Sequence, residues 1–342
     1  MSTDLLRDAL HAVVAGDDLD TDTSRRVMDV MMDGGAPPAQ VGALLTALRM
    51  KGESVDELTG MVESMRNHAT RVTLDVDAVD TAGTGGDSAG TFNVSTTAAL
   101  IAAGAGCAVA KHGNRAASSR CGSADVLEAL GVAIELSPQG VARCVAEAGI
   151  GFMFAPAFHP AMRHVAPIRR ELGVRTVFNV LGPLANPAFV RRQALGVADA
   201  SLVPLVAGVL QRIGHQHAIV FSGPHGVDEL GVGGVAHGLE VTPTAIRALE
   251  FDPEQWGMSA APLAAVRGGD ATHNAALTRA VLDGEPGPPR DVSLLNAAVV
   301  LVAAGRAADM GEGLERARES VDSGEARQRL SSLIAVSNGA AL

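Results

Sequence analysis

The sequence has few of the features that a protein needs in order to bind nucleic acid. Aromatic residues make up only 3% of its 342 residues, with no tyrosine, so side chains on which bases could stack are scarce. The formal net charge is −11, which is opposite to the basic balance that a phosphate backbone attracts. Lysine occurs only at Lys51 and Lys111. We therefore expect no nucleic-acid partner.

Cysteines and long hydrophobic runs are also scarce. The three cysteines, at 107, 121 and 144, are odd in number and have no CxxC spacing, which is typical of reduced thiols. Residues 1–9 are polar and contain no apolar core of signal-peptide length. The apolar stretches 96–110 and 292–304 are too short, or too interrupted by glycine, to span a bilayer. These features predict a cytoplasmic protein without a membrane partner.

What the sequence does contain is the composition of an α/β protein, with 47% hydrophobic and 19% charged residues. The first 70 residues predict helices. In 38–50, Val41, Leu44, Leu45 and Leu48 recur at helical spacing, with proline at the start and Gly52 at the end. The run 54–57 (Ser-Val-Asp-Glu) is a capping box for the next helix. A block this small would pack its spare apolar face on the rest of the chain or on a second copy.

From residue 76 onward, predicted strands alternate with predicted helices. The strands are 78–82, 107–110, 151–155, 194–197 and 217–222. The helices are 95–103, 123–130, 138–149, 159–171 and a final one at 310–323, and 284–290 is a surface turn rich in glycine and proline. This alternation predicts a largely parallel sheet with helices on its faces.

Two glycine-containing loops between residues 80 and 125 carry the main functional signal. The first, 80–87, reads Asp-Thr-Ala-Gly-Thr-Gly-Gly-Asp, and Asn-Val-Ser-Thr follows at 93–96. Glycines let main-chain N–H groups approach a ligand closely, and the start of the following helix favours an anion. Asp87 would accept sugar hydroxyls or help to hold a cation. A purely structural turn is the alternative.

The second loop adds permanent positive charge. Lys111 and Arg115 flank a Gly-Asn pair, and serines at 118, 119 and 123 precede a helix. Cations and hydroxyl groups before a helix start suit a diphosphate, whereas a basic surface turn is the alternative for this loop alone. We expect the two loops to lie side by side and to bind one ligand bearing more than one phosphate. Because the chain is acidic overall, the site must supply local cations or a metal.

Charged residues elsewhere extend this hypothesis. Asp228 and Glu229 follow the strand 217–222, where paired carboxylates can hold Mg²⁺, although a solvated turn is the alternative. In the predicted helix 159–171, Arg163 and Arg170 would share a face while Arg169 would point elsewhere. One inward-facing guanidinium among them would suit a substrate carboxylate. The histidines at 112, 159 and 164 lack the spacing of a zinc site.

At these positions the sequence resembles the anthranilate phosphoribosyltransferases, which join anthranilate to phosphoribosyl pyrophosphate in tryptophan biosynthesis. The matching runs are 40–52, 83–87, 93–96, 111–115, 118–119, 122–131, 159–167, 175–187, 228–230 and 290–297. They cover nearly the whole chain. The Lys-His-Gly-Asn-Arg run at 111–115, together with Gly-Thr-Gly-Gly-Asp at 83–87, is highly specific to this family.

The resemblance implies a small N-terminal helical domain, 1–72, joined by helices from about 160–190. It also implies a larger α/β domain, 73–342, with a largely parallel central sheet flanked by helices. Family members are usually homodimers joined through the helical part.

The resemblance also implies the roles of individual residues. Those binding phosphoribosyl pyrophosphate would be Gly83, Gly86, Asp87, Thr91, Asn93, Val94, Ser95, Thr96, Lys111, His112, Gly113, Asn114, Arg115, Ala116, Ala117, Ser118, Ser119 and Ser123. Those binding Mg²⁺ would be Ser95, Asp228 and Glu229. Those contacting anthranilate would be Gly83, Asn114 and Arg169, with Arg169 facing the carboxylate. The catalytic residues would be Lys111, Asn114 and Arg169.

One departure from the family and three alternatives remain open. Residues 231–234 are Gly-Val-Gly-Gly where the family commonly has serine or threonine, which leaves the number of metal ions open. A pyrimidine-nucleoside phosphorylase resembles this family in fold and would use phosphate and a nucleoside instead. A catalytically silent relative that binds nucleic acid is a second alternative. The third is the same chemistry on a substituted anthranilate.

Overall fold

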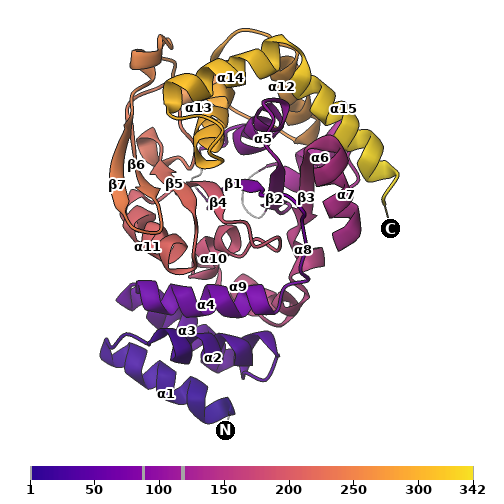
Figure 1. Cartoon of the computed structure of the whole chain (residues 1–342). Helices are drawn as coiled ribbons and strands as arrows, with labels where there is room; N and C mark the ends of the chain where they lie inside the picture. The colour runs from indigo at the N-terminus through magenta and orange to yellow at the C-terminus, as the bar shows by residue number, and fades with distance from the viewer. Residues whose placement is uncertain (1, 87–88, 117–119, 342) are drawn as a thin grey trace.

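The computed structural model describes residues 2–86, 89–116 and 120–341, and its first 67 residues form four helices, as predicted. They are α1 (Ser2–Ala15), α2 (Thr21–Met32), α3 (Pro38–Lys51) and α4 (Val55–Asn67), at the bottom of Figure 1. Gly52 ends α3 with φ +88°, and Ser54 and Glu57 make both hydrogen bonds of the predicted capping box at the start of α4. Local sequence signals therefore set the ends of these two helices.

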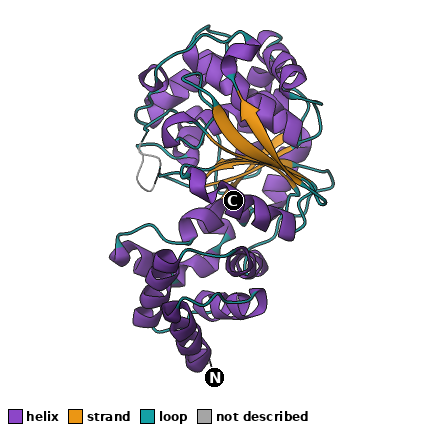
Figure 2. Cartoon of the chain, turned by 90° about the vertical axis from the view of Figure 1, so that its left-hand side faces the viewer, coloured by secondary structure: helices purple, strands orange, loops and turns teal. Residues whose placement is uncertain are grey.

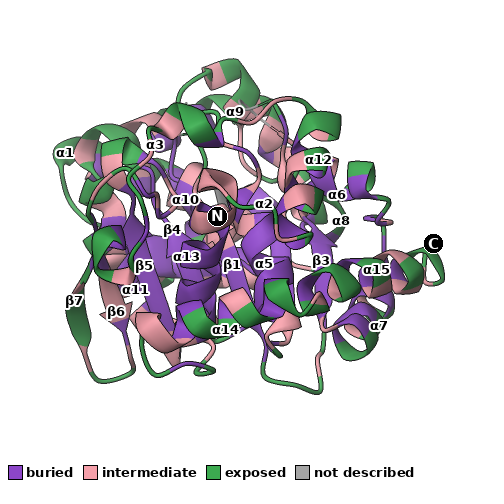
Figure 3. Cartoon of the chain, turned by 90° about the horizontal axis from the view of Figure 1, so that it is seen from above, coloured by how far each residue is buried: buried purple, intermediate pink, exposed green. Residues whose placement is uncertain are grey.

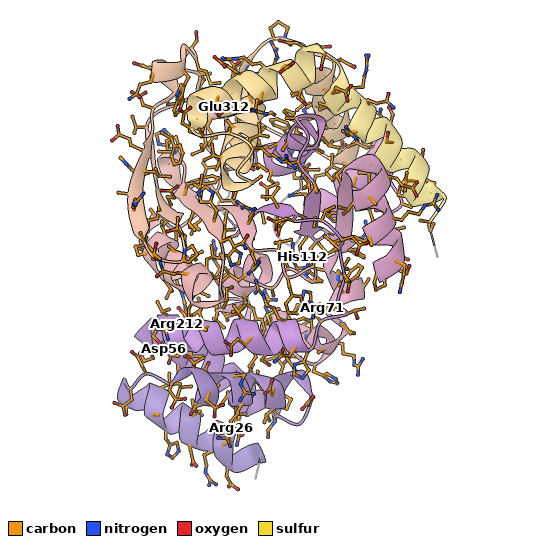
Figure 4. All side chains as sticks on the ribbon, in the orientation of Figure 1. Arg26, Asp56, Arg71, His112, Arg212 and Glu312 are labelled. Atoms are coloured by element: carbon orange, nitrogen blue, oxygen red, sulfur yellow. The ribbon has the colours of Figure 1, made fainter. Side chains whose placement is uncertain are left out.

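Helix α4 connects this helical block to the rest of the molecule. Its apolar residues Leu58, Met61, Val62 and Met65 are buried in a core that continues past α10 (Phe178–Leu184) and α11 (Val203–Arg212) to one face of the sheet. Asp56 and Arg212 form an ion pair across this boundary, with N and O atoms 3.0 Å apart (Figure 4). The spare face of the block thus packs on the chain itself, which was one of the two predicted outcomes.

The central sheet has seven strands in the order β3-β2-β1-β4-β5-β6-β7. Their bounds are β1 Val79–Gly83, β2 Val109–Gly113, β3 Ile150–Phe154, β4 Arg192–Gly196, β5 His217–Ser222, β6 Ala236–Val241 and β7 Ile246–Phe251. The first five pair in parallel, which confirms the predicted largely parallel sheet. The antiparallel hairpin β6–β7 at the edge was not predicted.

Helices cover both faces of this twisted sheet (Figure 2). In β5, Ile219 and Phe221 enter one core while Ala218 and Val220 enter the other. Burial on both faces suits β3, which reads Ile-Gly-Phe-Met-Phe and is buried throughout, whereas β1, β2 and β4 include polar or charged residues (Figure 3). The helices of the first core are α5 Val94–Gly104, α6 Ser123–Leu130, α7 Pro138–Ala148, α12 Ala271–Leu282, α13 Pro288–Ala303, α14 Met310–Asp322 and α15 Glu325–Asn338. None of the helices described here is both long and apolar enough to cross a membrane.

Three local predictions were wrong. Residues 159–171 form a 3₁₀ turn, Pro160–His164, and then α9 (Ala166–Leu172), after the short α8 (Ala155–Phe158). Each proline starts a new element because it lacks the N–H that would continue a helix, so the shared face proposed for Arg163 and Arg170 does not exist. The turn predicted at 284–290 ends earlier, because α13 begins at Pro288. Helix α14 is followed by α15 and is not the last.

The close crossing of α2 and α4 gives a test of the helical block. A Cβ at Gly60 would overlap the carbonyl oxygen of Thr21 and lie 2.7 Å from the main-chain nitrogen of Arg25. We expect Gly60→Ala to lower the free energy of unfolding by about 2 kcal/mol, measured by urea denaturation. Gly42→Ala on α3 is the control. Its Cβ would lie 3.6 Å from Leu172 Cδ2, so it should cost nothing, and equal effects of both variants would contradict the packing.

Candidate active site

The order of the sheet strands reverses between the paired strands β1 and β4, and the region beyond their carboxyl ends is what we call the crevice. The chain runs from β1 outward to β2 and β3, and then returns to β4 on the other side of β1. In such sheets, ligands bind outside the carboxyl ends of the strands at the point where the order reverses. Gly83 and Gly196 pair at this edge, and the loops after β1, β2 and β5 all begin there. The two glycine-containing loops therefore follow neighbouring strands, as predicted.

The loop after β1 contacts the two carboxylates that follow β5. The N–H of Gly85 donates to Asp228 Oδ2 at 2.6 Å, and the hydroxyl of Thr91 donates to Glu229 Oε2 at 2.8 Å. A Cβ at Gly83 would overlap the Asp228 carboxylate, so glycine is required there for the approach. The structure thus brings Gly83, Thr91, Asp228 and Glu229 together in the crevice. Asp87 lies outside the described residues.

Lys111 provides a buried positive charge beside these groups. It lies in β2, and its Nζ donates to the carbonyl of Thr81 at 2.6 Å and to Ser95 Oγ at 3.3 Å. Burial lowers the pKa of Lys111 to about 8, although the nearby carboxylates of Asp80, Glu229 and Asp228 act against this shift. The ammonium is therefore still protonated at neutral pH and lies at the beginning of α5.

The prediction assigned no role to Asp80, which lies directly beneath the site. Its side chain is fully buried in β1 and accepts hydrogen bonds from Asn186 Nδ2 at 2.8 Å and from the N–H of His112 at 3.2 Å. Burial raises the pKa of Asp80 to about 6, so it is mainly ionised at neutral pH. A carboxylate within an otherwise apolar strand was the available sequence signal for it. Asp80 and Asn186 together brace the start of the second loop.

The beginning of α5 offers main-chain groups rather than side chains. Val94 and Thr96 are buried in the core, and the Val94 N–H donates to the carbonyl of Phe92 at 2.7 Å, so Thr96 would offer a ligand its main-chain N–H group. Asn93 joins neighbouring segments, because its Nδ2 donates to the carbonyl of Cys121 at 3.2 Å and its Oδ1 accepts from Asn274 at 2.9 Å. Ser95 is half-buried and faces Lys111.

The second loop places its charged residue differently from the prediction. Arg115 forms ion pairs with Asp125 at 3.0 Å and with Glu128 on α6, and these carboxylates raise its pKa. Its charge is therefore already paired with these two carboxylates on the loop's own side. Gly113 lies against Ser123, and Ser123 Oγ donates to the carbonyl of Asn114 at 3.3 Å, which closes the loop onto α6. Ala116 N–H donates to Asp125. Ala117, Ser118 and Ser119 lie outside the described residues.

A cavity of about 540 Å³ lies next to the crevice, between the sheet and the helical block. Gly83, Asn114 and Arg169 all line it, so the three residues expected at the acceptor are brought together. The Arg169 guanidinium lies 5.1 Å from the centre of the Phe178 ring, and its partial burial lowers its pKa. Arg163 also lines the cavity, whereas Arg170 does not. Apolar walls with a guanidinium suit a ring that carries a carboxylate. The apolar wall residues include Met65, Pro156, Met162, Phe178 and Pro183.

Two histidines form part of the same cavity wall. The rings of His112 and His159 are 5.0 Å apart between centres, and both side chains are buried (His112 is labelled in Figure 4). Burial lowers the pKa of His112 to about 3 and that of His159 to about 4. Both rings are therefore neutral at physiological pH and add no charge to the site.

Comparisons with known proteins agree with this geometry. The family models of the glycosyl transferase family match the chain twice, the helical bundle domain at residues 7–69 and the a/b domain at 75–327. The anthranilate phosphoribosyltransferase of Chloroflexus aggregans is 56% identical over 98% of this chain and 99% of its own length. The Thermus thermophilus enzyme has a TM-score of 0.92 at 44% identity, covering 97% of this chain and 99% of that structure. The Saccharomyces cerevisiae enzyme in complex with PRPP and Mg has a TM-score of 0.90 at 27% identity, covering 98% of both chains.

The pKa of Lys111 gives a test of the anion site. Since the pKa is about 8, the ammonium loses its proton between pH 7 and pH 9. We expect the affinity for inorganic pyrophosphate, measured by calorimetry with Mg²⁺, to fall about tenfold over this range. Lys111→Arg is the control, because a guanidinium stays charged and should remove the fall. An identical pH dependence in both proteins would show that Lys111 does not bind the anion.

Proposed function

The chain belongs to the anthranilate phosphoribosyltransferase family, and we propose from this premise that it transfers the phosphoribosyl group of phosphoribosyl pyrophosphate to the amine of anthranilate. The products are N-(5-phosphoribosyl)anthranilate and pyrophosphate, in the second step of tryptophan biosynthesis from chorismate. The observation that carries this proposal is the position of the Lys111 ammonium beside two glycine-containing loops and next to a cavity with its own guanidinium. One half of the site suits a polyphosphate and the other an aromatic acid.

The donor would bind across the crevice. The main-chain N–H groups of Gly83, Gly86 and the first turn of α5 are proposed to receive phosphate oxygens, together with the Lys111 ammonium. The second loop, 112–119, with Ser123, would complete the pocket. Arg115 is proposed to bind the donor through its main-chain groups rather than its side chain, because its guanidinium is paired with Asp125 and Glu128.

The carboxylates of Asp228 and Glu229, with the hydroxyl of Ser95, are proposed to hold Mg²⁺. Their oxygen atoms are the ligands that Mg²⁺ prefers, and the three residues lie at one crevice. Within the described ranges, no group of three or more His, Cys, Asp or Glu side chains gathers around one point. Ligand phosphates would therefore have to complete the coordination, which fits a metal that arrives with the diphosphate. When bound, the ion would neutralise charge that develops on the leaving pyrophosphate.

The acceptor would lie in the cavity, with its carboxylate on Arg169 and its amine toward Gly83 and Asn114. The amine of anthranilate is an aniline, which is neutral at pH 7 and has its lone pair available. It therefore needs orientation rather than a strong base, in keeping with the low pKa values of His112 and His159. Holding two reactants in contact is itself a large source of rate acceleration.

The reaction would be a displacement at the anomeric carbon of the ribose, with an oxocarbenium-like transition state. The C–O bond to pyrophosphate breaks, its electron pair leaves with the pyrophosphate, and the amine lone pair forms the new C–N bond. The amine then loses a proton to solvent. Lys111 and the loop N–H groups would stabilise the charge on the departing oxygens.

We also propose that the helical part, residues 1–72 with helices from about 160–190, carries a homodimer contact. Met50 on α3 is 83% exposed, and a groove between α3 and α9 is lined mainly by apolar residues such as Ala43, Ile168 and Leu172. The domain boundary is supported by the ends of the two family matches, at 69 and 75. The remaining domain would be 73–342.

The metal proposal can be tested with a double variant. We expect Asp228→Ala, Glu229→Ala to lose at least about 100-fold of kcat, because the pyrophosphate charge would no longer be neutralised. The measurement is the fall in anthranilate fluorescence, with and without phosphoribosyl pyrophosphate and Mg²⁺. Glu250→Ala, Glu254→Ala, an exposed pair elsewhere, is the control. Unchanged Mg²⁺-dependent activity in Asp228→Ala, Glu229→Ala would refute the metal assignment.

A separate assay addresses the alternative enzyme. Release of thymine when the wild type is incubated with thymidine and phosphate would favour a pyrimidine-nucleoside phosphorylase.

The acceptor proposal can be tested at Arg169. Losing a charge-assisted contact with the carboxylate should raise the KM for anthranilate about 10- to 100-fold in Arg169→Gln, with a smaller change in the KM for phosphoribosyl pyrophosphate. Arg170→Gln is the control, because Arg170 is exposed and does not line the cavity. If Arg170→Gln raises this KM and Arg169→Gln does not, the assignment of the two arginines is wrong.

A further inference from the structure

Arg175 holds the first glycine-containing loop from outside the crevice. Its Nη1 donates to the carbonyl of Gly86 at 2.9 Å, and its Nη2 donates to the carbonyl of Gly85 at 3.3 Å. Gly85 and Gly86 have φ of +68° and +73°, which only glycine adopts without strain. A Cβ on Gly86 would lie 2.6 Å from Nη1, so the guanidinium is seated directly on the loop. The fork of one arginine thus binds two successive carbonyls.

Gly85 also contacts Asp228, one of the two carboxylates proposed to hold the metal. The Gly85 N–H donates to Asp228 Oδ2 at 2.6 Å while its carbonyl accepts from Arg175. Thr84 is fixed too, because its N–H donates to the carbonyl of Gly196 at 3.0 Å and its hydroxyl accepts from Ala198 N–H at 3.1 Å. Arg175 and Asp228 therefore both hold the peptide groups that follow Thr84, and Arg175 is the one that binds their carbonyls, where the donor would bind.

Arg175 also belongs to the segment that forms the acceptor cavity. Arg169, Phe178 and Asn179 line that cavity, and Arg175 lies between them in the sequence. Thr176 and Asn179 lock the intervening turn, since the Thr176 N–H donates to Asn179 Oδ1 at 3.0 Å and the Asn179 N–H donates to the Thr176 carbonyl at 2.9 Å. Two hydrogen bonds thus fix the backbone between the cavity-lining Phe178 and Asn179 and the neighbouring Arg175.

We propose that Arg175 is a positioning residue that couples the acceptor cavity to the donor loop, so that filling the cavity strengthens binding of phosphoribosyl pyrophosphate. This proposal rests on the function proposed above. Binding of an aromatic acid would hold the segment around Phe178 in place, and through Arg175 it would hold the carbonyls of Gly85 and Gly86. The N–H groups of the loop would then be ordered before the diphosphate arrives, and the second ligand would lose less freedom on binding.

A simpler reading is that Arg175 is a surface cation that attracts the diphosphate from a distance. Arg175 is exposed, which suits that reading. The two readings differ in what a lysine would do. Lysine keeps the charge, but it is a single ammonium and has no planar fork to bridge two carbonyls. If Arg175 acts by bridging the two carbonyls, its effect on donor binding is lost in Arg175→Lys. If it acts by attracting the diphosphate, the effect remains.

The experiment measures ligand affinities rather than turnover. Benzoate, which has the carboxylate and the ring but no amine, fills the cavity without reacting. The dissociation constant of phosphoribosyl pyrophosphate with Mg²⁺ is measured by calorimetry with and without saturating benzoate. It is measured for the wild type, Arg175→Ala and Arg175→Lys, with Arg170→Ala as the control at an exposed position of the same segment. Circular dichroism confirms that each variant is folded.

In the wild type and in Arg170→Ala, we expect benzoate to tighten binding of phosphoribosyl pyrophosphate about fivefold or more, a usual size for coupled sites. In both Arg175 variants this factor should fall to about 1, while benzoate alone binds as in the wild type. A wild-type factor of 1, or an undiminished factor in Arg175→Ala or Arg175→Lys, would overturn the coupling. Failure of the wild type to bind phosphoribosyl pyrophosphate at all would instead contradict the proposed function.

Discussion

A buried ammonium is the group on which the rest of the site depends. Moving the charge of Lys111 out of water is unfavourable, and a fold tolerates it only where opposite charges and hydrogen-bond acceptors surround it. Here the carbonyl of Thr81 accepts from it, and the carboxylates of Asp80, Asp228 and Glu229 act on it from two sides. Strands β1 and β2 must therefore be neighbours, and the loop after β5 must return over them. The buried ammonium would thus give a protein of net negative charge a local positive group for a polyanion.

The same carboxylates also have a second set of contacts within the loop. Gly85 and Thr91 donate hydrogen bonds to Asp228 and Glu229. The donors that suit a phosphate are therefore hydrogen-bonded to the carboxylates that suit a cation. A ligand that brings both phosphates and a cation replaces both kinds of contact at once. A phosphate alone would have to displace a carboxylate from the Gly85 N–H group. This arrangement fits the proposed ligand, in which the metal and the diphosphate would arrive together.

Local sequence signals predicted much of this molecule. The capping box at 54–57, the start of α7 at Pro138 and the two glycine-containing loops each depend on a few adjacent residues, and all were found. Features that depend on distant partners were missed. The β6–β7 hairpin lies at the sheet edge beside β5, and the pairing of Arg115 with Glu128 depends on how α6 packs. Asp80 did carry a local signal, because it is the one charged residue of β1, but its part in the site follows from its full burial, which the sequence does not give. Prolines 160 and 167 did carry a local signal for the broken helix, which the prediction of one continuous helix overlooked.

The continuous core beneath the sheet bears on how such a protein can evolve. Leu58 and Met61 of α4 share this core with Val206 and Leu210 of α11 and with Val220 of β5. Buried apolar side chains thus run from the fourth helix to the strands. Recombination that replaced the helical block with a foreign one would have to match these apolar surfaces side chain by side chain. We therefore expect substitutions in the helical block to be compensated by substitutions in the α/β domain, although the two occupy different segments of the sequence.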